Sequence, residues 1–299
     1  MGNPTLTVGI PFFNAEKGLL DSVRSVFAQT FHDWELILVD DGSTDSSLDI
    51  ARSIDDPRVK LLPADGKNRR LPARLNQITE TAKGDFIARM DADDLCHPKR
   101  FEMQLEYLSR HPEVDVVGSA ACVLNNQGQP DRKIQVALNH EEIFRNKYKT
   151  GVSIVHPSIM GKAQWFRRWP YDETNVRCED YELWLRSCKN SVFANLPDLL
   201  FFRDEFSSFQ ISKYAKSKNS AAKVICKYGP GEIGYISTAC QVLKRHFEIG
   251  IFAMAKTFKI HDLLIKKRQK YNSLSQEEIA DVTAAIEDIT KTDIPFLNT

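Results

Sequence analysis

The sequence predicts an α/β fold in which a mostly parallel sheet is flanked by helices. Short apolar runs alternate with segments of helical periodicity through the first 125 residues, which is typical of strands joined by helices. Turn-forming residues bound these runs, as in Asp40-Asp41-Gly42-Ser43. The chain has 299 residues, of which 42% are hydrophobic and 27% charged, so it can bury a sizeable core.

Each apolar run is expected to form one strand of the sheet. In chain order the runs cover residues 6–10, 35–39, 59–62, 86–90 and 114–117. Apolar residues at helical spacing predict four intervening helices. One covers 19–27, a second follows a cap at Ser43 or Asp45, a third covers 71–82, and a fourth follows Pro98. The alternation weakens from about residue 126, which predicts a less regular half that closes over the sheet.

A composition shift marks the C-terminal part of the chain. Residues 213–270 contain 13 Lys or Arg residues against three acidic residues, with an apolar patch from Ile249 to Met254 and a basic cluster, Lys266-Lys267-Arg268. This segment predicts helices with either a solvated basic face or a membrane-surface role. Residues 276–289 predict a final amphipathic helix. We therefore expect one domain over 1–212 and a helical extension over 213–299.

Charge and cysteine content exclude several classes of protein. The 40 Lys and Arg residues balance 40 Asp and Glu residues, so no overall basic field favours nucleic acid. Six scattered cysteines form no C-x-x-C pair, which argues against a zinc site and a secreted disulfide framework. The sequence has no signal-peptide pattern and no apolar run of membrane-spanning length. We expect a cytoplasmic protein, soluble or peripheral on a membrane.

Polar clusters follow three of the expected strands, where parallel sheets bind ligands. They are Pro11-Phe12-Phe13-Asn14, Asp40-Asp41 and Asp91-Ala92-Asp93-Asp94. The carboxylates of the last cluster repel one another unless a cation or solvent compensates them. Hard oxygen ligands favour Mg²⁺ or Mn²⁺, which bridge to substrate phosphates. A turn that leads to a helix cap is the alternative, and the position after a buried strand favours the metal.

The clusters after the second and third strands have two interpretations each. Asp40 and Asp41 are either turn residues or carboxylates that bind a nucleotide base or ribose. The sequence has no P-loop and no G-x-G-x-x-G motif. If a nucleotide diphosphate binds, a metal ion and basic side chains must therefore neutralise its charge. Lys67, Arg69 and Arg70 follow the third strand and either contribute to this or form a solvated loop.

Two sites in the second half also allow a structural and a chemical interpretation. Glu179-Asp180 begins a helical pattern, where the helix dipole favours acidic residues and where a carboxylate is suited to act as a general base. His156 is either a ligand or phosphate contact, or a structural histidine beside an apolar strand. No triad motif for a Ser or Cys nucleophile accompanies them.

Taken together, the motifs resemble the family 2 glycosyltransferases with the GT-A fold, of the bacterial cell-surface polysaccharide type. The resemblance rests on five segments in this order: Thr7–Asn14, Ser25–Thr30, Leu38–Asp45, Leu75-Asn76 and Ala88–Asp94. It extends more loosely to His156 and Glu179-Asp180. Residues 1–125 would then be the nucleotide-sugar half of the catalytic domain, and 126–212 the acceptor half.

The resemblance implies an inverting transferase that moves a sugar from a nucleotide diphosphate sugar, with UDP favoured, to a saccharide acceptor. The implied cofactor is Mn²⁺ or Mg²⁺, bound by Asp93. Asp180, with Glu179, would supply the base. The residues implied for the nucleotide-sugar site are Pro11, Phe13, Asn14, Asp41, Asn68, Arg70, Asp91, Ala92 and His156.

The resemblance further implies a lipid-linked acceptor, O-antigen or capsule assembly, and a position on the inner face of the cell membrane. The sequence departs from the family at Asn68, which the family often follows with Gly and which Arg69 follows here. A sugar nucleotidyltransferase is one alternative, but Pro11–Asn14 is not the Gly-rich basic loop it would carry. A noncatalytic nucleotide-sugar-binding protein is another, and it would retain Asp41 without the metal or base residues.

Overall fold

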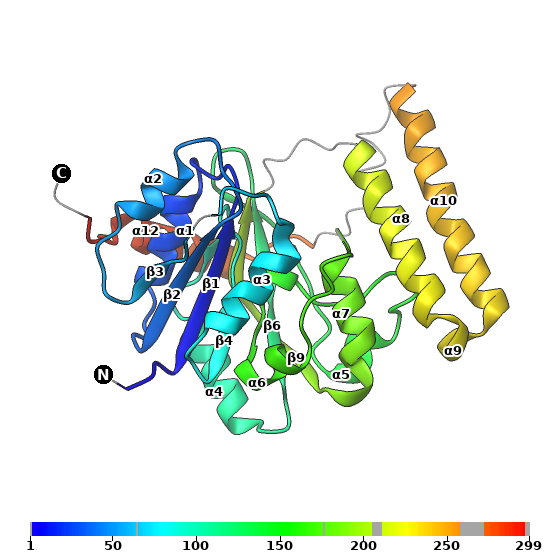
Figure 1. Cartoon of the computed structure of the whole chain (residues 1–299), viewed down its shortest axis with the longest axis horizontal. Coiled ribbons are helices and arrows are strands. Elements are labelled where there is room, and N and C mark those ends of the chain that lie inside the picture. The colour runs from blue at the N-terminus through cyan, green and yellow to red at the C-terminus, as the bar shows by residue number, and fades with distance from the viewer. Residues whose placement is uncertain (1, 64, 176, 205–210, 258–271, 297–299) are drawn as a thin grey trace.

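A computed structural model of the chain shows a central sheet with helices on both faces (Figure 1). It describes residues 2–63, 65–175, 177–204, 211–257 and 272–296. The strands of this part are β1 (Leu6–Phe12), β2 (Trp34–Asp40), β3 (Val59–Leu61), β4 (Phe86–Arg89), β5 (Leu95–Cys96), β6 (Val116–Leu124), β7 (Pro130–Ile134), β8 (Met160–Lys162) and β9 (Phe193–Asp204).

Helices fill most of the connections between these strands. The α-helices are α1 (Leu19–Phe27), α2 (Ser47–Arg52), α3 (Arg70–Thr81), α4 (Arg100–Arg110), α5 (His140–Phe144), α6 (Ala163–Arg168), α7 (Glu179–Ser187), α8 (Ile211–Tyr228), α9 (Pro230–Ile233), α10 (Tyr235–Thr257) and α12 (Gln276–Lys291). Two short 3₁₀ turns add to them, η1 (His156–Ser158) and η2 (Cys188–Asn190).

The sheet is parallel in its first half and mixed in its second. The strand order is β3-β2-β1-β4-β8-β6-β9-β5, with β7 paired to β6. Strands β1 to β4 pair in parallel, as predicted, because helices carry the chain back between them. From β8 onward most pairs are antiparallel, and only β6 and β9 run in parallel. The predicted α/β fold class is confirmed, with a sheet that is parallel in its first half and mixed in its second, where antiparallel pairs lie beside the long parallel ladder of β6 and β9.

Two predicted strand ends and one predicted cap differ from the structure. β1 continues through Pro11 to Phe12, beyond the predicted end. Its pairing with β4 stops at Gly9, so Pro11 faces no partner on that side that would need its missing N–H. β6 extends to Leu124 because it is buried along its whole length, pairs with β9 throughout and pairs with β7 from Ala121 onward. Ser43 does not cap α2, since its Oγ accepts the Asn14 N–H instead.

The amphipathic helices bury their apolar faces against the sheet. On α1 the fully buried positions Leu19, Val23 and Val26 follow helical spacing. The final helix, α12, begins with a capping box of Ser275 and Glu278, as its sequence pattern allows. Its buried residues Val282, Ala285 and Ile289 pack against β6 and β9. The last helix of the predicted extension therefore packs on the sheet.

The other helices of the extension stand apart from the sheet. α8 packs against α10 along its length and against α7 at its side (Figure 1). The predicted basic cluster Lys266-Lys267-Arg268 lies outside the described residues. Among the helices that the structure describes, none combines the length and the hydropathy that crossing a bilayer would require. The boundary at residue 212 stays a prediction.

Candidate active site

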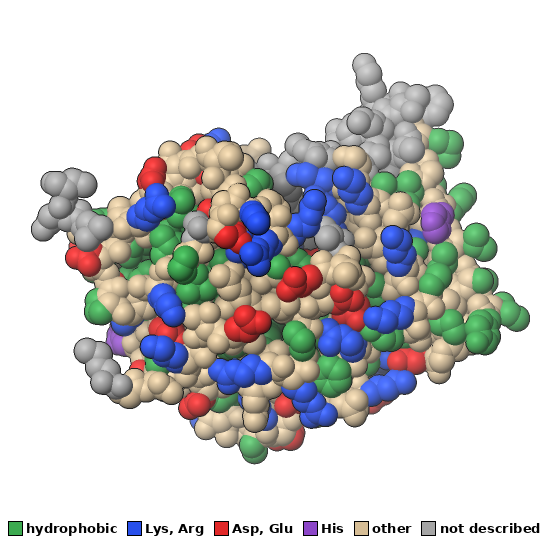
Figure 2. Space-filling model, in the orientation of Figure 1, with side chains coloured by type: hydrophobic (Ala, Val, Ile, Leu, Met, Phe, Trp, Pro, Cys, Tyr) green, Lys and Arg blue, Asp and Glu red, His purple; other side chains and the backbone are tan. Residues whose placement is uncertain are grey.

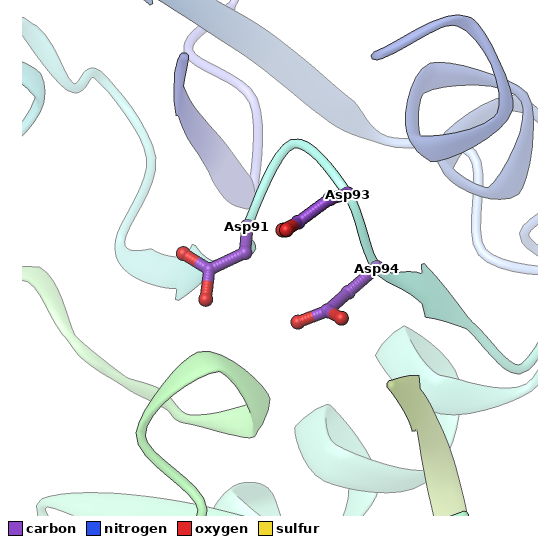
Figure 3. Close-up of side chains that lie close together, drawn as sticks. All are labelled: Asp91, Asp93 and Asp94. Atoms are coloured by element: carbon purple, nitrogen blue, oxygen red, sulfur yellow. The ribbon is translucent and has the colours of Figure 1, made fainter. Parts of the chain in front are cut away.

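An acidic cluster follows β4, at the end of the parallel half of the sheet. Figure 3 shows Asp91, Asp93 and Asp94 converging from the loop that leads to β5. One carboxylate oxygen from each lies within 4.8 Å of the others. Ser22 on α1 fixes this loop, since its Oγ donates to the backbone oxygens of Asp91 at 2.7 Å and Asp94 at 2.8 Å. Gly18 is required beside it, because a Cβ there would lie 2.9 Å from the Asp93 Cα.

The three carboxylates differ in exposure and in charge compensation. Asp94 is buried, Asp91 accepts a hydrogen bond from Arg89 Nη2 at 2.5 Å, and Asp93 is open to solvent. Reduced solvation and the nearby Asp91 charge raise the pKa of Asp93. A cation would relieve this repulsion, and carboxylate oxygens are the ligands that Mg²⁺ and Mn²⁺ prefer. The predicted metal ligand, Asp93, and its neighbours therefore fit a divalent cation.

The loops after β1 and β2 are tied together beside this cluster. Asn14 has a left-handed backbone, with φ of 51°, and its Oδ1 accepts the Thr44 N–H at 2.8 Å. The Asn14 N–H donates to Ser43 Oγ at 3.1 Å. The neighbouring ring of Phe13 is 48% exposed, whereas Pro11 is buried within β1. Of the predicted residues here, Phe13 and Asn14 are therefore the ones open to a ligand.

Asp41 anchors the loop that precedes α3. Its Oδ1 accepts the backbone N–H of Arg69 at 2.7 Å and Arg74 Nε at 2.9 Å, and its Oδ2 accepts the Arg70 N–H at 3.0 Å. Arg74 is 1% exposed and also donates to Asp65 at 2.8 Å, which lowers the pKa of Asp65 to about 2. Asp41 is thus a structural anchor. Its Oδ2 accepts fewer hydrogen bonds than Oδ1 and is therefore the oxygen that could accept one more, such as from an N–H group of a nucleotide base.

Other predicted residues of the nucleotide-sugar site differ in accessibility. Asn68 and Arg70 are exposed in the anchored loop, and Ala92 is buried within the acidic loop. Asp40 serves the turn, since its Oδ1 accepts the Ser43 N–H at 2.9 Å. Arg70 has a φ of 71°, which costs a non-glycine residue roughly 1 kcal/mol and is held by the Asp41 contact.

Glu179 and Asp180 form the first turn of α7. Asp180 is half-buried, and its Oδ1 accepts the Tyr181 N–H at 2.7 Å. Glu179 is buried, and its Oε2 has no partner in the described part of the chain. Burial raises the pKa of both carboxyls, and the Asp180 charge raises that of Glu179 further. Asp180 has the accessibility and the raised basicity that suit a general base.

Arg89 lies between the two acidic groups and was missed by the sequence analysis. Its side chain is 4% exposed, and its Nε and Nη1 have no hydrogen-bond partner among the described residues. The Arg89 charge lowers the pKa of Asp93, Glu179 and Asp180, so both acidic groups share one electrostatic environment. A charged residue inside the apolar run 86–90 was the available signal.

His156 occupies a buried aromatic cluster. Its Nε2 lies 2.8 Å from the hydroxyl of Tyr171, and its ring meets the edge of Trp184 with centroids 5.7 Å apart. Burial and the positive charge of Arg89 hold the pKa of His156 well below its usual range, so the ring is neutral. These contacts favour the structural interpretation, and a phosphate contact stays a prediction.

A large cavity opens beside Asp180. It has a volume of about 770 Å³ and lies between α7 and the paired helices α8 and α10. Trp184 and Tyr214 contribute rings to its wall, Lys244 contributes positive charge, and Lys218 is paired there with Glu248. Mixed aromatic and polar walls suit a saccharide, whose ring has apolar faces and hydroxyl edges. The candidate base therefore faces a space that can hold a second substrate.

Known proteins resemble this chain over most of its length. The family model Glycosyl transferase family 2 matches residues 7–172. The Bacillus subtilis protein EpsE, named as a glycosyltransferase, is 32% identical over 229 residues, which cover 74% of this chain and 81% of EpsE. The amylovoran biosynthesis glycosyltransferase AmsE of Erwinia amylovora is 31% identical over 65% of this chain and 74% of AmsE.

A third relative is named for its substrates. It is the UDP-Glc:alpha-D-GlcNAc-diphosphoundecaprenol beta-1,3-glucosyltransferase WfgD of Escherichia coli, which is 26% identical over 74% of this chain and 80% of WfgD.

Solved structures share the fold at lower identity. Staphylococcus aureus TarS residues 1–349 with UDP-GlcNAc match with a TM-score of 0.59 and 18% identity, covering 97% of this chain and 82% of that one. The mannosyltransferase PcManGT of Pyrobaculum calidifontis, with GDP-Man and Mn²⁺, matches with a TM-score of 0.58 and 15% identity, covering 96% and 86%. The fold predicted from the sequence, a GT-A fold, is confirmed.

Proposed function

Because the chain belongs to glycosyl transferase family 2 and is a glycosyltransferase by that membership, we propose that it transfers a sugar from a UDP-sugar to a saccharide with inversion. One observation carries this proposal: the charge of Arg89 acts both on an acidic cluster suited to a divalent cation and on Asp180, whose carboxylate lines a large cavity. The WfgD name and the TarS complex favour UDP as the nucleotide, and the PcManGT complex favours Mn²⁺.

The donor would lie over the ends of β1, β2 and β4. Phe13 and Asn14 would flank the nucleotide, with Oδ2 of Asp41 toward the base and Asp91 toward the ribose and sugar. Asp93, with Asp91, would hold Mn²⁺ or Mg²⁺, which supplies Lewis-acid stabilisation of the leaving diphosphate when bound. Arg89, two of whose nitrogens have no partner among the described residues, would add positive charge in the same region.

Asp180 would remove the proton from the attacking hydroxyl of the acceptor. The hydroxyl oxygen then forms a bond to the anomeric carbon while the bond to the diphosphate breaks, which inverts that carbon in a single displacement. Such a displacement needs one base and no covalent nucleophile. Partial burial of Asp180 supports the role, because a carboxylate of raised pKa is the stronger base.

Turnover of a labelled donor tests the proposed reaction. A panel of nucleotide sugars is first screened by thermal shift with Mn²⁺, since a ligand that binds the folded state raises the apparent stability. The best donor is then incubated with saccharide acceptors, with and without EDTA. We expect metal-dependent transfer and a product of inverted anomeric configuration by NMR. Transfer that EDTA leaves unchanged, or a retained configuration, would contradict the proposal.

We also propose that the acceptor is lipid-linked and that the enzyme meets it at an anionic membrane surface, during O-antigen or capsule assembly. The acceptor in the WfgD name is a diphosphoundecaprenol saccharide, and AmsE is named for a polysaccharide. The excess of ten positive charges in residues 213–270 favours an anionic surface, at about 1 kcal/mol for each nearby basic side chain.

An apolar stripe along α10 gives the protein a second attraction to lipid, in addition to its basic charge. Ile236, Leu243, Phe247 and Met254 are 83%, 68%, 68% and 59% exposed. At 100° for each residue these four side chains fall within about 40° of one another, along about 27 Å of helix. Figure 2 shows hydrophobic side chains along the outer edge of α10. Exposed apolar residues in such a row are typical of an interfacial helix.

Cosedimentation with vesicles tests the membrane proposal. We expect binding to phosphatidylglycerol vesicles that salt weakens, and little binding to phosphatidylcholine. The double variant Leu243→Ser/Phe247→Ser should lose the binding, whereas Leu138→Ser, an exposed apolar position outside α10, should keep it. Equal and negligible binding of the wild-type protein to both vesicles would leave residues 213–270 as a solvated face.

A further inference from the structure

A second cavity, lined mainly by cations, lies beside the one at Asp180. It has a volume of about 400 Å³, and its lining residues are Arg70, Arg177, Lys216, Asn219, Ser220 and Lys223. Four of these six residues carry a positive charge, and none carries a negative one. Figure 2 shows Lys and Arg side chains gathered over the gap between α3 and α8. The cavity is therefore an electropositive recess at the front of the site.

The four cations have no internal counter-ion in the part of the chain that the structure describes. Some other cations in the described part of the chain do have such a partner, such as Lys147 with Glu232 at 2.6 Å and Arg74 with Asp65 at 2.8 Å. Unpaired cations that face one cavity repel one another, and this repulsion disappears when an anion enters. Two arginines, two lysines, a hydroxyl and an amide together match a phosphate or diphosphate group.

Helix α8 separates this cavity from the one at Asp180. Lys216, Ser220 and Lys223 recur at helical spacing and line the electropositive recess. The residues between them, including Ser217 and Ala221, line the cavity at Asp180. Arg177 precedes Asp180 by three residues and lies just before α7 begins. An anion held in the recess is thus adjacent to a saccharide that reaches the candidate base.

This position favours the acceptor over the donor as the source of the anion. The donor diphosphate would already be compensated by a cation at Asp93 and by Arg89. Two of the four cations, Lys216 and Lys223, come from α8, which lies beyond the region matched by the family model. We therefore propose that the recess binds a phosphate group of the acceptor, so that the acceptor is a saccharide phosphate ester. This inference rests on the proposed transferase function.

Direct binding of inorganic pyrophosphate tests the recess without requiring turnover. Calorimetry is done in EDTA, so that a metal at Asp93 does not contribute. The double variant Lys216→Gln/Lys223→Gln should bind pyrophosphate at least about tenfold more weakly, because two charge-assisted contacts are lost. Lys213→Gln, which removes an exposed charge from α8 outside the cavity, should bind like the wild-type protein. Equal affinity of all three proteins would overturn the proposal.

Transfer kinetics then identify the source of the phosphate. The same saccharide is supplied as a lipid diphosphate and as a neutral glycoside. We expect the double variant to raise the acceptor KM at least about tenfold for the diphosphate only, with the donor KM unchanged. A raised donor KM, or an equal loss with both acceptors, would overturn the assignment to the acceptor. If the wild-type protein transfers to neither acceptor, the proposed function fails, while the pyrophosphate result still decides whether the recess binds an anion.

Discussion

The proposed donor side of the site, around Asp41 and Asp93, and the proposed acceptor side, around Asp180, are built in different ways. On the donor side the carboxylates are held by backbone N–H groups and by buried arginines, as in the contacts of Asp41 with Arg69, Arg70 and Arg74. On the acceptor side most of the lining comes from exposed and half-buried side chains on helices α7, α8 and α10, with Trp184 and Arg245 as buried members. The donor side is thus fixed by the sheet, whereas the acceptor side can vary in sequence at little cost in stability.

The largest expected effect is on the acceptor side, at the candidate base. Asp180→Asn should lower the transfer rate by about 10³-fold, the contribution typical of a general base, because the amide cannot accept the proton. The rate is measured at saturating donor and acceptor. Glu179→Gln is the matched control and should keep more than a tenth of the activity. If Asp180→Asn turns over normally, Glu179 or water is the base.

A donor-side substitution should instead reduce stability. Arg74→Met removes the charged partner of the buried Asp41 carboxylate and should lower the free energy of unfolding by about 3 kcal/mol. Lys216→Gln on the acceptor side is the comparison, and its stability should match that of the wild-type protein because the side chain is exposed. Urea denaturation measures both. Equal stabilities of the two variants would remove the distinction between the two sides.

The smallest expected effect is a shift in the pH dependence of the transfer rate. It tests whether Arg89 acts electrostatically on both sides of the site. Burial raises the pKa of Asp180, so transfer should be lost as pH falls through a value above the ordinary aspartate pKa of about 3.9. The Arg89 charge opposes this rise, so Arg89→Met should move the acidic limb of the rate profile to higher pH. Arg89→Lys retains the charge and should leave the limb in place. A limb that does not move with Arg89→Met would show that the two acidic groups are not coupled.

The sequence predicted most of the donor side, because its residues follow strands directly and so share one sheet edge. Asp91, Asp93 and Asn14 are local in this sense, and their strands were visible as apolar runs. Arg89 was missed because no spacing rule indicates that a charged residue inside a buried strand points into a site. Its two unpartnered nitrogens become visible only in three dimensions.

The acceptor side could not be predicted to the same extent. The motif made Asp180 the candidate base, but the recess joins Arg70 and Arg177 to residues of α8 that are distant in sequence. Only the packing of α8 against α7 and α10 brings these residues together, and the periodicity of a helix does not specify its partner. The basic composition of residues 213–270 allowed either a solvated face or a membrane-surface role, and in the described part of this segment Lys216 and Lys223 line the recess while Lys244 lines the cavity at Asp180.

The affinity for the donor nucleotide in two variants tests most directly whether the site has a donor side and a separate acceptor side. UDP is titrated with Mn²⁺ into the wild-type protein, Asp93→Ala and Asp180→Asn by calorimetry. We predict that Asp93→Ala abolishes the metal-dependent part of binding without loss of thermal stability, because this exposed carboxylate is repelled by Asp91. Asp180→Asn should bind UDP within severalfold of the wild-type affinity. Metal-dependent binding that survives in Asp93→Ala, or that is lost equally in both variants, would contradict a donor side centred on Asp93 and an acceptor side centred on Asp180.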